Sequence, residues 1–162
     1  MIDGPQVVYT HVATGHSDLL VVCSQLEAIA DGLPDDFDRH SCLALAKTLS
    51  QRLSAVQAFE EETWFPRLLS WHTLGDEMGS IIDDLHRDHQ MDLFQAEEIQ
   101  EMLAGYADGR PDIAHDAAGF MLRALFEGLR RHIRLEQALL LPLTRLRHDR
   151  RSAPLPVPVD PC

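Results

Sequence analysis

The stretch RHIRLEQALLLP, residues 131–142, has the apolar spacing of an amphipathic helix, yet it also carries polar residues on its apolar side. His132 and Glu136 stand one helical turn apart, on a line of positions that otherwise holds apolar residues such as Leu125 and Leu129. A carboxylate that faces a protein core is strongly destabilising unless a positive charge meets it, and no Lys or Arg lies on this line. We therefore expect a bound cation here, with further ligands supplied by other helices.

Apolar residues with helical spacing recur through most of the chain. They predict four helices, over residues 15–30, 35–70, 80–104 and 111–148. The sequence contains no strand-like alternation and no glycine-rich nucleotide loop. Amphipathic helices joined by short loops predict an all-α, up-down-up-down four-helix bundle, in which sites form from side chains that face each other in the core.

The two ends of the chain are expected to lie outside this bundle, which covers residues 14–148. Residues 1–13 include a glycine and a proline and predict an irregular N-terminal arm. Residues 149–162 contain four prolines and predict a flexible tail. The length of 162 residues otherwise suits a single domain with one sizeable core.

Composition restricts the classes of partner and compartment. The net charge of −12 argues against nucleic acid and against an anionic membrane, because both attract basic surfaces. Three cysteines without a CxxC pair predict free thiols in a reducing compartment. No apolar run has the ~18 residues that a membrane span needs, and no signal-peptide pattern opens the sequence. We expect a soluble, cytoplasmic protein.

Polar residues interrupt the apolar lines of the other three helices as well. His16, Glu60 and His89 occupy such inward positions, one in each helix. With 1.5 Å of rise per residue, counting from the turns places Glu60 beside His89, and His132 within side-chain reach of His89. The same count leaves His16 offset from Glu60 by about 10 Å. Since His16 stands near a helix start, a polar capping role is its alternative.

Two of the expected helices repeat one pattern. VQAFEEETWFP, residues 56–66, and HIRLEQALLLP, residues 132–142, each place a glutamate six residues before a proline. One turn before that glutamate, the first segment has Val56 and the second has His132. With one inward histidine on each remaining helix, the chain consists of two similar helix-pair halves. Matched ligand sets of this kind are what a two-metal site between four helices requires.

The combination of Asp88-His89, EEETWFP and HIRLEQALLLP resembles the hemerythrin-like HHE cation-binding domain family over roughly residues 12–147. The resemblance implies a hemerythrin-like bundle around a non-haem di-iron centre, with two iron ions joined by an oxo or hydroxo bridge. Carried over position by position, it implies as ligands His16, Glu60, His89, His132 and Glu136. One position departs from the family pattern, because the family's histidine on the second helix is Val56 here.

The loss of that histidine leaves three alternatives for the metal beside Val56. The metal has an open or water-filled position, it binds weakly, or another histidine replaces the missing ligand. His86 is the nearest replacement, although its direction otherwise predicts a surface residue, and His11 is a second one. The neighbouring Glu61 is assigned to a solvated face of its helix, and the histidines at positions 40, 72, 115 and 148 receive no role.

The function implied by the resemblance is binding of, or reaction with, dioxygen, peroxide or nitric oxide, or sensing of oxygen or iron. Ligands without sulfur suit iron, with manganese or zinc as alternatives, and iron is favoured where dioxygen is handled. An open metal position favours reaction with dioxygen or peroxide over reversible carriage. The alternative is a degenerate one-metal or metal-free bundle that acts as a regulatory or interaction module. The E-x-x-H order of ferritin-like oxidases is absent, and neither an enzymatic activity nor an oligomeric state is indicated.

Overall fold

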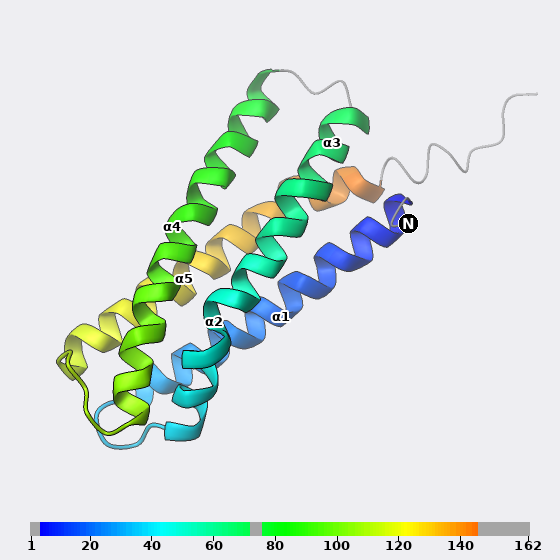
Figure 1. The fold of residues 1–162 in the computed structure, drawn as a ribbon. Coiled ribbons are helices and arrows are strands. Elements are labelled where there is room, and N and C mark those ends of the chain that lie inside the picture. Colours follow the sequence, from blue (N-terminus) through cyan, green and yellow to red (C-terminus); the bar gives the residue numbers. More distant parts are fainter. Residues whose placement is uncertain (1–3, 72–75, 146–162) are drawn as a thin grey trace, which may run out of the picture.

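The computed structural model describes residues 4–71 and 76–145, and every regular element within these ranges is helical. In chain order the elements are α1 (Pro5–Gly32), α2 (Arg39–Phe59), η1 (Glu60–Trp64), α3 (Phe65–Trp71), α4 (Asp76–Ala107) and α5 (His115–Leu139). Because α2, η1 and α3 follow one another without a break, the described chain forms four rods that run in alternating directions (Figure 1). α1 and α4 each pack against both α2 and α5. The structure confirms the predicted all-α, up-down-up-down four-helix bundle.

The second rod begins at Arg39, four residues later than predicted, because Asp38 caps it. Asp38 accepts hydrogen bonds from the backbone N–H groups of His40 and Ser41, each at 3.0 Å. Such a cap satisfies donors that the first helical turn leaves without partners inside the helix. The late start shortens this rod by about 6 Å and so removes part of the predicted offset between the first two rods.

Residues 5–13, predicted to form an irregular arm, are instead the first turns of α1. Pro5 stands at the first helical position, where its missing N–H is not needed and its fixed φ suits a helix. Val8 and Val12 follow at a spacing of four residues and are buried in the apolar cluster that contains Trp64. The proline therefore marks the start of a helix and not an irregular segment.

The remaining boundaries differ from the prediction by a few residues. α4 extends beyond the predicted range at both ends, and α5 begins at His115 and not at Pro111. The backbone makes a turn at Leu140, two residues before Pro142, and is helical again over residues 141–145. Proline cannot donate the helical hydrogen bond and crowds the preceding turn, which accounts for this break. The predicted end of the last helix at residue 148 and the predicted tail lie outside the described residues.

The core consists of two apolar clusters, one toward each end of the bundle. The larger includes Leu26, Leu45, Leu49, Leu103 and Leu122. The smaller includes Val8, Trp64, Leu68, Ile82 and Leu140. None of the helices in the described ranges combines the length and the apolar character that crossing a bilayer requires.

We expect the substitution Asp38→Ala to lower the free energy of unfolding by about 1 kcal/mol, because the first turn of α2 loses its cap. Urea unfolding of the metal-free protein followed by circular dichroism measures the change. Asp36→Ala is the matched control, since Asp36 is exposed and the same charge is removed. Equal stabilities of the two variants would contradict the capping role.

Candidate metal centre

A layer of polar side chains separates the two apolar clusters. Four rods supply it, with His16 from α1, Glu60 from η1, His89 from α4, and His132 and Glu136 from α5. The His132 side chain is 8% exposed, and the other four are at most 3% exposed. The structure thus brings together, inside the bundle, the five residues that the sequence analysis expects as ligands.

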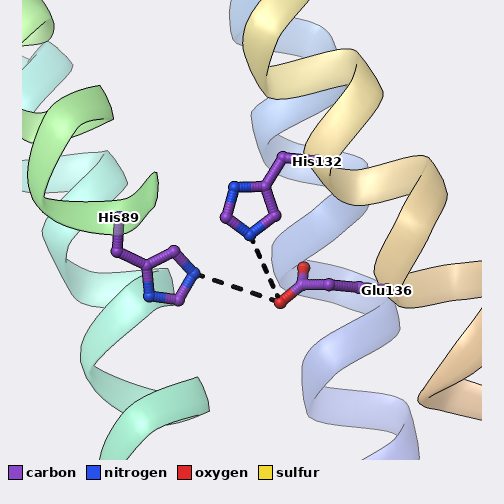
Figure 2. A group of neighbouring side chains, drawn as sticks. All are labelled: His89, His132 and Glu136. Carbon is purple, nitrogen blue, oxygen red and sulfur yellow. Dashed lines mark ion pairs between the residues drawn. The ribbon is translucent and has the colours of Figure 1, made fainter. Parts of the chain in front are cut away.

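The two carboxylates of this layer each face imidazoles on both sides. Glu60 places Oε1 3.0 Å from Nε2 of His16 and Oε2 3.5 Å from Nε2 of His89. Glu136 places Oε2 at 3.0 Å from the same nitrogen of His16. Its Oε1 lies 3.5 Å from Nε2 of His132 and 4.0 Å from Nε2 of His89, and both rings point toward it in Figure 2. Each carboxylate therefore divides its two oxygens between two groups of donors, as a carboxylate that bridges two cations does.

The donors form two groups, each of which could hold a cation. The His16 position consists of His16, Glu60 and Glu136, and the paired-histidine position consists of His89, His132 and Glu136, with Glu60 Oε2 close by. Such nitrogens and oxygens bind zinc at about 2.1 Å, so two donors to one ion lie at most about 4.2 Å apart. All the distances above are within this limit. The small cavity at the paired-histidine position has a volume of about 10 Å³, the space of one water or small ion.

Unpaired polar atoms indicate that these residues suit a cation. In the part of the chain that the structure describes, the buried side-chain atoms without a hydrogen-bond partner are His16 Nδ1, His132 Nε2 and Glu136 Oε1. The last two face each other at the paired-histidine position. Buried polar atoms almost always have a partner, and a nitrogen and a carboxylate oxygen are both metal ligands. A cation at this position would satisfy both of them.

The imidazoles of the layer differ in their protonation. Burial lowers the pKa of His16, but hydrogen bonds with Glu136 and Glu60 outweigh burial and raise the pKa to about 9. Burial is likewise outweighed at His132, where Asp92 and Glu136 raise the pKa to about 10. Two protonated imidazoles therefore supply the positive charge of the layer when no metal is bound.

Burial and neighbouring charges also shift the pKa values of the other three groups of the layer. Burial lowers the pKa of His89. Burial raises the pKa of Glu60, whereas at Glu136 the imidazoles of His132 and His16 outweigh burial and lower the pKa. Because the two carboxylates interact, they titrate as a pair. Of the two, Glu60 is the one that holds a proton more readily.

Two further carboxylates lie outside the layer and contact its histidines. Nδ1–H of His89 donates a hydrogen bond to Oε1 of Glu61 at 2.6 Å, and Nδ1–H of His132 donates to Oδ2 of Asp92 at 3.2 Å. The assignment of Glu61 to a solvated face is therefore wrong for its carboxylate. The cause is the π-helical turn η1, in which the N–H of Phe65 bonds back five residues to the carbonyl of Glu60. More residues per turn bring the directions of successive side chains closer together, so that adjacent glutamates face the same layer.

On the second rod Gln57 is buried more deeply than Val56, which packs at the edge of the larger apolar cluster. Gln57 is buried and lines the cavity at the paired-histidine position, together with Glu60 and His89. Val56 is half-buried and faces α1, where a Cβ on Gly15 would lie 3.1 Å from its nearer methyl group. The spacing of four residues from the buried Leu53 was the signal in the sequence that could have identified Gln57.

Neither proposed replacement histidine joins the two cation positions. The His86 ring lies 5.6 Å from that of Phe65, on the flank of α4. His11 stacks on Phe59 with ring centroids 3.8 Å apart. Both therefore have aromatic neighbours in this structure, and the groups that could hold a cation in the described ranges contain neither of them.

A family model described as the hemerythrin HHE cation-binding domain matches residues 7–144. This range contains all five residues of the polar layer as well as Glu61 and Asp92. The comparisons with curated proteins and with solved structures found no match.

Filling both positions with divalent cations at pH 7 should release more than two protons per chain, because His16 and His132 are protonated in the metal-free layer, Glu60 with its pKa raised to about 7 is partly protonated, and ligation requires neutral imidazole and ionised carboxylate. The affinity should accordingly rise as the pH is raised from 7 toward 9. Isothermal titration calorimetry in buffers of different ionisation enthalpy counts the protons. A binding enthalpy that does not depend on the buffer would contradict the protonation of the layer.

Proposed function

This chain belongs to the hemerythrin HHE cation-binding domain family, and we propose that its polar layer holds two non-haem iron ions that react with dioxygen, peroxide or nitric oxide. The observation that supports two ions and not one is the division of both carboxylates. Glu60 and Glu136 each direct one oxygen to the His16 position and the other to the paired-histidine position. If only one ion were bound, one oxygen of each buried carboxylate would have no metal and would contact histidines only.

The donor set supports iron. Imidazole nitrogens and carboxylate oxygens without thiolate suit iron, manganese and zinc, and the histidine–carboxylate combination with an open position is typical of iron proteins that handle dioxygen. The buried thiols of Cys23 and Cys42 belong to the larger apolar cluster and not to the polar layer. With neutral imidazoles the layer carries two negative charges, so two iron(II) ions would leave an excess of positive charge for an incoming anion to offset.

The His16 position is where we propose that the small molecule reacts. It has one imidazole where the paired-histidine position has two, because Val56 carries no ligand atom. A mostly apolar pocket of about 510 Å³ lies between α1 and α2, and Gly15, Val56 and Phe59 line it as far as Glu60. An apolar approach suits dioxygen and nitric oxide. Iron(II) bound in the layer would supply the electrons for their reduction.

A second role is supported by the charge balance of the metal-free layer. His16 and His132 are protonated there and lie within ion-pair distance of Glu136 and Asp92, so each buried positive charge has a negative partner without metal. A chain that is folded both with and without metal could act as a regulatory module that reports metal loading.

We expect anaerobic loading with iron(II) to give about two irons per chain, and admission of air to give an oxidised spectrum that removal of oxygen does not reverse. Elemental analysis and visible absorption measure the two results. Glu136→Gln should retain at most one iron, because both positions lose a carboxylate oxygen. Glu97→Gln, which neutralises an exposed glutamate of α4, is the matched control and should load as the unaltered chain does.

One iron or none in the unaltered chain would favour the regulatory module over the di-iron centre. A stable spectrum that appears in air and disappears when oxygen is removed would instead indicate a reversible carrier.

A further inference from the structure

The three imidazoles of the polar layer differ in the hydrogen bonds that their Nδ1 atoms make. Nδ1 of His89 is bonded to Glu61, and Nδ1 of His132 is bonded to Asp92. Nδ1 of His16 is buried and has no hydrogen-bond partner among the described residues. A hydrogen bond from Nδ1–H to a carboxylate fixes which nitrogen faces the metal and fixes the ring orientation. Only the two histidines of the paired-histidine position have this support.

The two supporting bonds connect three rods. Glu61 on η1 holds a ring of α4, and Asp92 on α4 holds a ring of α5. The rings of His89 and His132 also stack on each other, with centroids 4.8 Å apart and planes inclined by 9°. Figure 2 shows Nε2 of both rings directed at the same carboxylate oxygen of Glu136. This pair of ligands is therefore set in place before any cation arrives.

The surroundings of His16 give less support. The ring meets Trp64 edge-on at a centroid distance of 6.1 Å, which restricts its position but does not select a tautomer. Its Nε2 is engaged by Glu60 and Glu136, both at 3.0 Å. On the side where a second imidazole could stand, Val56 packs beside Gly15. A cation here would have one imidazole, without a bond that orients it.

We propose that Glu61 and Asp92 are positioning residues that make the two cation positions unequal, with the paired-histidine position filled first and more tightly than the His16 position. The inference rests on the proposed binding of two cations in the polar layer. Supporting carboxylates of this kind typically change metal affinity by about 10-fold to 100-fold when they are removed. One ion is thus held more tightly, and the weaker one shares Glu60 with the lining of the apolar pocket through which a small molecule could approach.

Titration of the full chain with Co²⁺, followed by calorimetry and by the visible absorption of the ion, tests this order of filling. The unaltered chain should bind two Co²⁺ ions with affinities at least about 10-fold apart. His16→Ala should remove the weaker ion and keep the tighter one. Loss of the tighter ion in this variant, or two ions of equal affinity in the unaltered chain, would overturn the proposed order.

Glu61→Gln and Asp92→Asn keep the size of each side chain and remove its charge. Each should weaken the tighter ion by about 10-fold to 100-fold and shift its absorption band, because the imidazole becomes a poorer and less oriented donor. The matched controls are Glu62→Gln and Asp83→Asn, which neutralise exposed carboxylates on the same two rods. Thermal unfolding of the metal-free variants separates positioning from general stability, since only a positioning residue changes the Co²⁺ band of a chain that is folded like its control.

The Co²⁺ titrations distinguish failure of the positioning role from failure of the proposed two-cation centre. If Glu61→Gln and Asp92→Asn bind two ions as their controls do, the positioning role is wrong and the two-cation centre stands. If the unaltered chain binds no Co²⁺, the two-cation centre itself is overturned.

Discussion

Two carboxylates buried side by side are the constraint on which this structure depends. Glu60 and Glu136 stand in a layer that water barely reaches, and their negative charges need positive partners within a few ångströms. Protonated imidazoles provide these partners in the metal-free chain, and cations would provide them more strongly. Metal binding in this layer would therefore replace protons as the source of positive charge beside the two carboxylates.

The apolar clusters on either side give the layer its rigidity. Buried apolar residues stand about one turn before and after the polar residues of α1 and α5, and on the other two rods Trp64 follows Glu60 and Leu85 precedes His89, so the polar side chains have little freedom to leave the layer. In the smaller cluster, the indole N–H of Trp64 donates to Oγ1 of Thr144 at 2.9 Å and ties the second rod to the end of the described chain. The π-helical turn Glu60–Trp64 begins in the polar layer and ends in the smaller cluster, and it sets the direction of two adjacent glutamates. The second rod thus supplies a ligand and a support for a ligand on another rod.

The halves of the bundle are similar in sequence pattern and unequal in chemistry. Val56 occupies the position that corresponds to His132 in the repeated pattern. The carboxylates of Glu61 and Asp92 form hydrogen bonds with the histidines of α4 and α5, and not with His16 of α1. If the two proposed cations bind, their positions would therefore differ in strength. The more strongly held cation would keep the ligands in place while the other exchanged its own ligands.

The sequence by itself determined the helical bundle and the residues that meet in its core. Helical periodicity places His89 and Glu136 on inward lines whatever the neighbouring helices are, because the direction of a side chain follows from its position along the helix. The start of α1 could also have been read correctly, since Pro5 at a first helical position, followed by Val8 and Val12, is a local signal.

Only the tertiary structure decided how the side chains pair across the helices. The hydrogen bonds of Glu61 and Asp92 depend on a π-helical turn and on the register between rods, neither of which a periodicity of 3.6 residues contains. The same register brought His16 to within 3.0 Å of both carboxylates and left His86 beside Phe65. Spacing along one helix fixes a direction, whereas the distance between atoms of two helices follows from packing that involves the whole core.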